Sequence, residues 1–387
     1  MNANENGRIV HDIARTFLIK VNKIKTYKNL YPKIYSYNNL LLAYKKAKKR
    51  KSSKKYVIDF QKDKQNNLLK IKKELENQTY KPSKLTKIII RDPKTRTINK
   101  SQFKDRIVHH TIVNILEPIY EKVFINDNYA NRKNKGTLKA VQRFDKFKRK
   151  TSNNGKLVKY NKNDNMVKGY ILKADIKRFF ETIDQDVLIN MLRRKLKDKK
   201  LILLIKQILS NYEGGGAKQK GMPLGNMTSQ FLANVYLNEL DYLVKHKLKA
   251  KYYLRYVDDF IILHQSKQQL IKWKEEINNF LNNKLKLELH KDKTKIISMH
   301  NGVNFLGYKL FYYFRLLRKR NINTFRKILH NKIKRYKNNQ LDKEKLLSSI
   351  DGWFGYAQHA NTYNLRKSIL KEVSLTKNDK QTTLFGY

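Results

Sequence analysis

Apolar residues recur at helical spacing in several long segments of the chain, and this period predicts helices. The expected helices cover 56–76, 103–124, 186–209, 228–248 and 268–284. Pro118 is expected to break or kink the second of them. Residues 1–55 and the tail beyond Thr324 are also helical in pattern and strongly basic. Helices are therefore expected at both ends of the chain, separated by segments of another period.

Shorter apolar runs, bounded by turn residues, predict strands between these helices. The expected strands cover 167–176, 252–257, 260–264, 295–299 and 305–314. Residues 85–98 alternate around Asp92-Pro93, which predicts a β-hairpin. Loops are expected at 150–166 and at the glycine run 214–216, while the turn at 134–137 opens a further helix. The order predicts a mixed α+β fold with a helical C-terminal subdomain.

The net charge of the chain indicates which class of partner it binds. The 86 Lys and Arg residues outnumber 32 Asp and Glu, which gives a formal net charge of +54. An AT-rich coding sequence explains part of the lysine content, but most lysines lack acidic partners. A nucleic-acid backbone is the expected counterion, with an anionic membrane surface as the weaker candidate. No apolar run approaches the ~18 residues of a transmembrane helix, and the N-terminus lacks a secretory pattern. We therefore expect a soluble, cytoplasmic protein without a membrane partner.

Three aspartates occur where strands are expected to end. Asp175 closes the apolar run 171–174, and Asp258-Asp259 fill a tight turn between two apolar strands. Adjacent carboxylates in such a turn repel each other, so stability does not favour them. A solvated turn would explain the pair alone, but it does not explain the third acid. The chain has no cysteine, so a metal here must bind oxygen or imidazole ligands, and Mg²⁺ prefers carboxylates and phosphate oxygens. Transfer of a nucleotide needs two such ions.

Residues near the three acids suit a nucleotide pocket. Phe180 is placed to close the pocket floor against a ribose 2′-oxygen, although core packing explains it equally well. Gly225, in the turn 221–226, allows close backbone approach, and Ser229 and Gln230 follow at the start of a helix. A plain helix cap is the simpler explanation of the hydroxyl there.

Four cations have positions that suit phosphate chemistry. Arg91, Lys94 and Arg96 lie on the predicted hairpin, where they can grip a triphosphate. Lys293 follows the acid pair and can protonate a leaving pyrophosphate as a general acid. Ordinary surface charge explains any one of them equally well in so basic a chain. The run 41–55 is the best candidate for a further face that binds RNA or a partner.

In order, the chain resembles the successive motifs of reverse transcriptases. The motifs read "LKADIKRFFETID", "GMPLGNMTSQFLANVYLNELD", "YLRYVDDFIIL", "HKDKTKI" and "NFLGYKL". The core Tyr256-Val257-Asp258-Asp259 is a common signature of that family, and the ordered set from about Thr86 to Tyr308 is highly specific. The resemblance implies a right-hand polymerase fold of the α+β class. Its expected parts are a basic helical extension (1–85), fingers (86–166), palm with some fingers elements (167–308) and thumb (309–387).

The resemblance also implies roles for single residues. Asp175 and Asp258 would bind both of two Mg²⁺ ions, with Mn²⁺ as an alternative, while Asp259 supports the second ion and Ile176 contributes its carbonyl. Phe180 matches the steric gate against ribonucleotides. The motif "NFLGYKL" supplies a primer grip at Phe305, Leu306 and Gly307. The expected partners are an RNA template, a DNA or RNA primer and deoxynucleotides.

The branch of the family is indicated by two further segments. Residues 102–144 resemble the fingers of bacterial group-II-intron-like enzymes, above all those of diversity-generating retroelements. The spacing Gly-Asn-x-x-Ser-Gln at 225–230 is similar to that branch, as is the terminal segment 351–370. Asn131 and Leu138 depart from its pattern, where cysteine and histidine are expected. This branch implies a bacterial or phage-encoded enzyme with a small basic helical accessory protein.

Three alternatives remain at this point. A phage-defence reverse transcriptase shares this compact build and uses a dedicated noncoding RNA. An RNA-directed RNA polymerase shares the palm, but Phe180 speaks against it, because such enzymes need a small or polar residue there. A non-catalytic RNA-binding scaffold would not require all three aspartates.

Overall fold

The computed structural model describes residues 25–91, 95–158, 166–212 and 219–374. Their contacts divide the chain into two compact units. The first unit comprises 1–89, 97–123 and 180–236, and the second comprises 90–96, 124–179 and 237–387. Each unit is described by itself below. Within the described ranges, none of the helices has both the length and the apolarity needed to cross a membrane.

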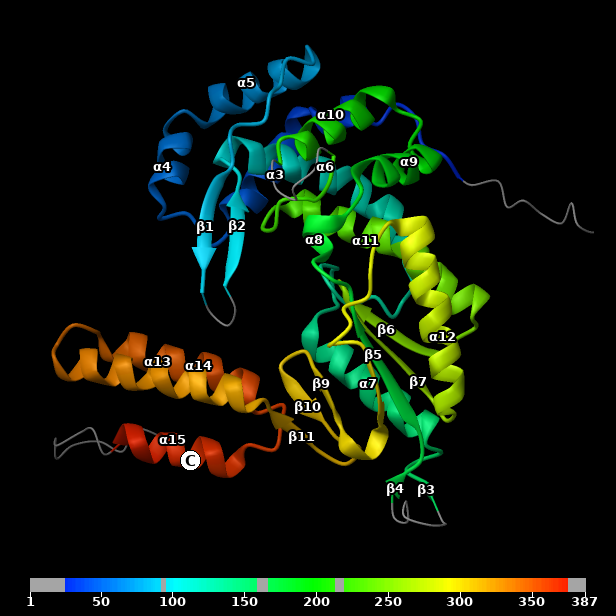
Figure 1. The fold of residues 1–387 in the computed structure, drawn as a ribbon. Coiled ribbons are helices and arrows are strands. Elements are labelled where there is room, and N and C mark those ends of the chain that lie inside the picture. Colours follow the sequence, from blue (N-terminus) through cyan, green and yellow to red (C-terminus); the bar gives the residue numbers. More distant parts are fainter. Residues whose placement is uncertain (1–24, 92–94, 159–165, 213–218, 375–387) are drawn as a thin grey trace, which may run out of the picture. The chain divides into compact units, whose positions relative to one another are not determined.

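Helix α6 (Phe103–Glu121) is the centre of the first unit (Figure 1). The helices around it are α2 (Tyr31–Ile34), α3 (Tyr37–Lys48), α4 (Lys55–Lys62) and α5 (Lys64–Glu76). Buried Ile107, Ile112 and Leu116 recur on α6 at helical spacing. The helix runs unbroken through Pro118, so the expectation of a break there is wrong, while the alternative of a kink stays a prediction. The expected helix over 56–76 is likewise divided, because α4 and α5 meet at Asp63.

The helix expected over 186–209 is two helices, α9 (Gln185–Lys195) and α10 (Lys199–Ser210). Each begins at a capping aspartate: Asp184 accepts from the Val187 amide, and Asp198 from the Leu201 amide. The second oxygen of Asp198 accepts from the amides of Leu30 and Tyr31, each at 2.7 Å. This buried carboxylate therefore both divides the helix and fixes the start of α2.

A hairpin precedes α6, as expected. Strands β1 (Thr86–Ile90) and β2 (Arg96–Lys100) form a two-stranded sheet, and Asp92-Pro93 lie outside the described residues. In the first unit, the amide of Asn99 donates to the carbonyl of Leu224 at 3.0 Å. The chain passes between the two units within α8 (Phe179–Thr182) and α11 (Met227–Tyr242).

A four-stranded antiparallel sheet in the order β6-β7-β5-β8 is the centre of the second unit. Its strands are β5 (Tyr170–Asp175), β6 (Tyr252–Tyr256), β7 (Asp259–His264) and β8 (Lys295–Ser298). Helix α12 (Lys267–Phe280) packs against β5, β7 and β8, and α7 (Thr137–Thr151) packs against β6 and β7 (Figure 1). Ile171, Ile261 and Leu263 share one hydrophobic core with Val141 and Phe144 of α7. The alternation of the strands thus buries both faces of the sheet.

Several boundaries in this unit differ from expectation. Residues 150–166 are not wholly a loop, because β3 (Leu157–Val158) pairs with β4 (Met166–Val167). The expected strand 167–176 is interrupted at Gly169, which has φ of +121° and a Cβ position only 3.1 Å from the Met299 side chain. The ends of α11 and α12 continue as π-helical turns over Leu243–Lys247 and Leu281–Leu285.

The C-terminal part begins with a small sheet in the order β11-β10-β9, followed by three helices. Its elements are β9 (Val303–Phe305), β10 (Tyr308–Leu310), β11 (Arg315–Leu317), α13 (Lys319–Lys337), α14 (Lys343–Ala357) and α15 (Tyr363–Ser374). The single strand expected over 305–314 is wrong, because Leu306 and Gly307 have positive φ and turn the chain. Phe325 stacks on Trp353 with ring centroids 4.2 Å apart and anchors the helical core.

Candidate active site

Neighbouring strands of the central sheet bring the three predicted aspartates together. Asp175 is the last residue of β5, Asp259 is the first of β7, and the two are direct partners in the antiparallel register. Asp258 lies in the turn between β6 and β7, and its carbonyl accepts from the Ile176 amide at 3.3 Å. This hydrogen bond joins the turn to the end of β5. The three residues, called the aspartate trio below, therefore lie at one end of the sheet.

The turn that carries Asp258 has an unusual backbone. Val257 has φ of +56°, a left-handed conformation that a β-branched residue rarely adopts. Such a conformation costs on the order of 1–3 kcal/mol and persists only where its surroundings hold it. Arg255 supplies one such contact, since its Nη1 donates to the Val257 carbonyl at 3.0 Å.

Arg255 is itself held by a fully buried ion pair, which the sequence analysis did not assign. Its Nε and Nη2 donate to the two carboxylate oxygens of Asp241 at 2.7 and 2.6 Å, and neither side chain is exposed. The Tyr253 hydroxyl donates to the same carboxylate at 2.7 Å. A charged residue within the apolar strand 252–257 was the available signal, because a buried guanidinium requires a carboxylate partner.

Fewer cations than carboxylates lie within ion-pair distance in the aspartate trio. Burial raises the pKa of Asp258 to about 6, and the nearby charge of Asp175 adds to the effect. Burial also raises the pKa of Asp259 to about 7, with Asp175 and Asp258 adding to it while Lys173 opposes it. Lys173 lies 3.4 Å from Asp259, and Lys293 lies 3.1 Å from Asp175. Two lysines thus face three carboxylates, and Lys173 was not among the predicted residues.

The fit of the trio to a metal rests on its carboxylate oxygens. Oδ1 of Asp259 is buried and has no hydrogen-bond donor among the described residues, since the approach of Lys173 is an ion pair only. In the part of the chain that the structure describes, no three carboxylate or imidazole side chains form a complete ligand cluster. Magnesium usually takes only one or two carboxylates and completes its shell with water and substrate phosphates. An all-oxygen set with an unsatisfied carboxylate fits that chemistry.

The predicted cations of the hairpin and the motif residue Tyr256 also belong to the second unit. Arg91 and Arg96 are exposed, and the charge of Arg96 lowers the pKa of Asp258 against the larger effect of burial. Lys94 lies outside the described residues. Tyr256 is half-buried, and its hydroxyl is 3.3 Å from that of Thr137.

The predicted primer grip lies on the turn between β9 and β10. Phe305 is buried in the core, so only its backbone is available to a ligand. The Gly307 carbonyl accepts from the Tyr356 hydroxyl at 2.9 Å and from Asn321 at 3.3 Å. A Cβ at Gly307 would lie 2.6 Å from that hydroxyl, so the turn requires glycine. Side chains of α13 and α14 therefore hold the shape of this turn.

Four predicted nucleotide-binding residues belong to the first unit. The Phe180 carbonyl accepts from the Met222 amide at 2.7 Å, which ties α8 to the turn 221–226. Gly225 has φ of +110°, and a Cβ there would lie 2.7 Å from the Ile98 side chain. Ser229 is buried, and Gln230 is half-buried. The structure thus explains the glycine by backbone geometry alone.

Comparisons with known proteins identify the family. Residues 81–310 match the family described as "Reverse transcriptase (RNA-dependent DNA polymerase)". Protein YkfC of Escherichia coli (strain K12) is 27% identical over 280 residues, which cover 62% of this chain and 70% of that protein. The group II intron-encoded protein LtrA of Lactococcus lactis subsp. cremoris is 27% identical over 313 residues, which cover 62% of this chain and 49% of LtrA. The chain thus matches only about half of LtrA.

Among solved structures, telomerase from Candida albicans is similar with a TM-score of 0.45 and 12% identity, covering 78% of this chain and 56% of that one. A score this low supports no conclusion about function. The family match spans more than half of the chain and includes the aspartate trio. The chain therefore belongs to the reverse transcriptase family, the RNA-directed DNA polymerases of right-hand fold, and resembles within it the group II intron-encoded proteins.

Proposed function

We propose that the chain copies an RNA template into DNA at the aspartate trio, with two divalent metal ions. The observation that carries the proposal is the strand register, which brings Asp175 and Asp259 side by side next to Asp258. Burial raises the pKa values of Asp258 and Asp259, and the neighbouring carboxylates add to the effect. Family membership supports the same chemistry.

In this proposal, Asp175 and Asp258 would hold both Mg²⁺ ions, Asp259 would support the second and Ile176 would contribute its carbonyl. The bound ions would supply activation of the 3′-hydroxyl and charge neutralisation at the leaving pyrophosphate. Arg255 keeps the Val257 carbonyl in place, and so orients the turn that presents Asp258. Lys293, which is bonded to Asp175 and about two-fifths exposed, is placed to donate a proton to pyrophosphate.

The other assignments belong to the same proposal. Phe180, Gly225, Ser229 and Gln230 are the nucleotide-binding residues, and Phe180 excludes ribonucleotides. Arg91, Lys94 and Arg96 are assigned to gripping a triphosphate. Residues 305–307 grip the primer. The regions 86–166, 167–308 and 309–387 act as fingers, palm and thumb, and 1–85 is a basic extension. The partners are RNA, a primer and deoxynucleotides.

Deoxynucleotide incorporation on a primed RNA template with Mg²⁺ tests the proposal. The wild type is expected to extend the primer, and the Asp258→Asn/Asp259→Asn variant to lose at least a thousandfold in rate, an effect on the order of that seen when charge stabilisation is removed from an active site. Thermal unfolding of both proteins shows that the variant is folded. Equal extension by the two proteins would refute the assignment of the trio.

For the biological role, we propose diversification of a gene by a diversity-generating retroelement, with a small basic accessory protein. The support is the spacing at 225–230 and the fingers segment 102–144. Defence against phage with a dedicated noncoding RNA is the second candidate, supported by the compact polymerase region. Sequencing of the RNA bound to the protein in its host separates them. A transcript of a variable-gene repeat supports the first role, and a dedicated noncoding RNA supports the second.

A further inference from the structure

The exposed face of α7 carries a row of cations. Lys139, Lys146 and Arg149 are exposed and follow each other at intervals of about one or two helical turns, while Val141 and Phe144 face the core. A rise of ~1.5 Å per residue makes this row about 15 Å long. One strand of nucleic acid carries a phosphate every ~3.4 Å along a duplex axis, so the row spans about four phosphates.

This face forms one wall of a hollow with a volume of about 620 Å³. The residues that line it are Tyr129, Asn134, Lys135, Lys139, Gln142, Arg143, Asp145, Lys146, Arg149 and Arg315. Six of them are cationic, and only Asp145 is acidic. Asp145 is already paired with Lys148 and Arg315. The hollow, called the basic groove below, therefore has a large excess of positive charge.

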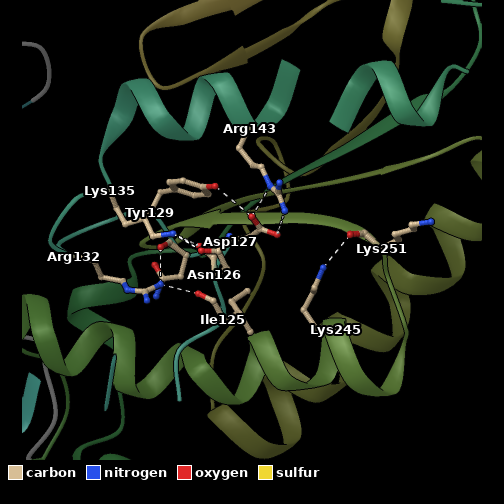
Figure 2. Close-up of polar contacts among 10 residues, drawn as sticks. Ile125, Asn126, Asp127, Tyr129, Arg132, Lys135, Arg143, Lys245 and Lys251 are labelled. Atoms are coloured by element: carbon tan, nitrogen blue, oxygen red, sulfur yellow. Dashed lines mark hydrogen bonds and ion pairs between the residues drawn. The ribbon is translucent and has the colours of Figure 1, made fainter. Parts of the chain in front are cut away.

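Hydrogen bonds hold three of these cations in place, and two of them, Lys135 and Lys139, have only uncharged partners in these bonds. Nζ of Lys135 donates to the carbonyl and side-chain oxygens of Asn126 at 2.7 and 2.6 Å, and Nζ of Lys139 to the Asn134 carbonyl at 2.7 Å. Figure 2 shows Arg143 reaching from α7 to Asp127, with contacts of 2.8 and 3.2 Å. Only this last partner is charged. A preorganised cation loses less entropy when it binds a phosphate.

The groove suits a phosphate backbone and not a nucleobase. Tyr129 is the only aromatic residue among its lining residues, and it is buried with Lys135 over its ring at 5.0 Å. No lining ring is therefore available for a base to stack on. Helix α7 begins at Thr137, whose hydroxyl is 3.3 Å from that of Tyr256 in the catalytic motif. The cationic row thus starts beside the turn of the aspartate trio and leads away from it.

We infer that the basic groove binds the sugar–phosphate backbone of the RNA strand, independently of sequence. The choice of RNA as the occupant rests on the proposed function, whereas the phosphate chemistry follows from the groove itself. The groove adds an RNA-binding surface along α7 that depends on Lys139, Lys146 and Arg149 and not on the acids or the nucleotide pocket.

Binding of a fluorescent single-stranded RNA to the full chain, measured by anisotropy at several salt concentrations, tests the inference. The variant Lys139→Gln/Lys146→Gln/Arg149→Gln is expected to bind at least tenfold more weakly and to lower the salt slope by about 2, since each lost contact to single-stranded RNA removes ~0.7. The matched control, Lys267→Gln/Lys272→Gln/Lys284→Gln, removes the same charge from exposed positions on α12 and the turn after it. It is expected to change affinity less than threefold.

Equal losses in the two variants, or no loss in the groove variant, would overturn the inference. Unfolding temperatures within a few degrees of the wild type verify that both variants are folded. The incorporation assay separates this inference from the proposed function. A wild type that extends the primer while the groove variant binds RNA normally refutes the groove alone. A wild type that binds RNA through the groove and extends nothing refutes the polymerase proposal alone.

Discussion

The aspartate trio lies at one end of the central sheet, whereas the Arg255–Asp241 pair joins β6 of that sheet to α11, and the charged groups of the two regions differ in how they are compensated. The pair is completely buried, yet each carboxylate oxygen of Asp241 accepts a hydrogen bond from the guanidinium. The trio is partly exposed, yet an oxygen of Asp259 has no donor among the described residues. Burial alone therefore does not determine which carboxylates are electrostatically destabilised. The number of hydrogen-bond and ion-pair partners does, and the trio has the incomplete set of partners that is typical of a cation-binding site.

The two regions are also connected. Arg255 uses two of its donors on Asp241 and a third on the Val257 carbonyl, next to Asp258. The neutral pair can thus be a rigid support for the charged trio. Separate changes to the pair, the trio and the link between them distinguish these roles.

Breaking the Arg255–Asp241 pair is expected to change the free energy of unfolding most. Asp241→Ala leaves the guanidinium of Arg255 buried without its carboxylate, which should lower the free energy of unfolding by about 3–5 kcal/mol. Urea unfolding followed by circular dichroism measures the change. The control is Asp342→Ala, which removes an aspartate whose partner, Lys345, is about as exposed as itself. No measurable change is expected there. A loss below about 1 kcal/mol for Asp241→Ala would show that the pair does not stabilise the fold.

Of these two regions, the sequence indicated the aspartate trio but not the Arg255–Asp241 pair. Three acids at strand ends indicated the trio because local pattern alone fixes a strand end and a turn. Arg255 and Asp241 lie on different elements, and only the packing of α11 against the sheet joins them. The division of 186–209 and the turn at Leu306 were missed for the same reason. Asp198 is bonded to the distant amides of Leu30 and Tyr31, and Gly307 to Tyr356.

Neutralising Asp258 and Asp259 of the trio is expected to change the free energy of unfolding less than breaking the pair does, and to raise it instead of lowering it. Asp258 and Asp259 have pKa values of about 6 and about 7 in the folded chain, above the ~3.9 of an unfolded aspartate. The folded state therefore binds more protons between about pH 4 and 7, so its stability falls as pH rises through that range. Without divalent metal at pH 8, Asp258→Asn/Asp259→Asn should be more stable than the wild type, because the folded wild type must then keep both buried carboxylates charged.

Thermal unfolding at pH 8 and at pH 5 measures this difference. The advantage of the double variant should shrink at pH 5, where the wild-type carboxyls are largely protonated in the folded state. Asp145→Asn is a suitable comparison, because its carboxylate is paired with Lys148 and Arg315, so its removal should destabilise the chain. A double variant that is no more stable than the wild type at pH 8 would mean that the trio is not strained.

Weakening the hydrogen bond from Arg255 to the Val257 carbonyl, which links the two regions, is expected to change the free energy of unfolding least. Its effect should be specific to catalysis. Arg255→Lys keeps a buried cation for Asp241, but one ammonium group cannot reproduce the planar set of donors that also reaches the Val257 carbonyl. We expect kcat for deoxynucleotide incorporation to fall about tenfold, the lower end of the range for residues that orient metal ligands, with little change in the KM for the deoxynucleotide.

A merely structural role for Arg255 would lower stability and leave the dependence on Mg²⁺ unchanged. If the link positions Asp258, the variant should instead require a higher Mg²⁺ concentration for half-maximal rate, and excess Mg²⁺ should restore part of the lost activity. Leu254, the buried neighbour of Arg255 in β6, provides the control. Leu254→Val should lower stability by cavity formation without a shift in Mg²⁺ dependence. If the rate depended on Mg²⁺ concentration in the same way for the wild type and Arg255→Lys, the pair would stabilise the fold without positioning Asp258.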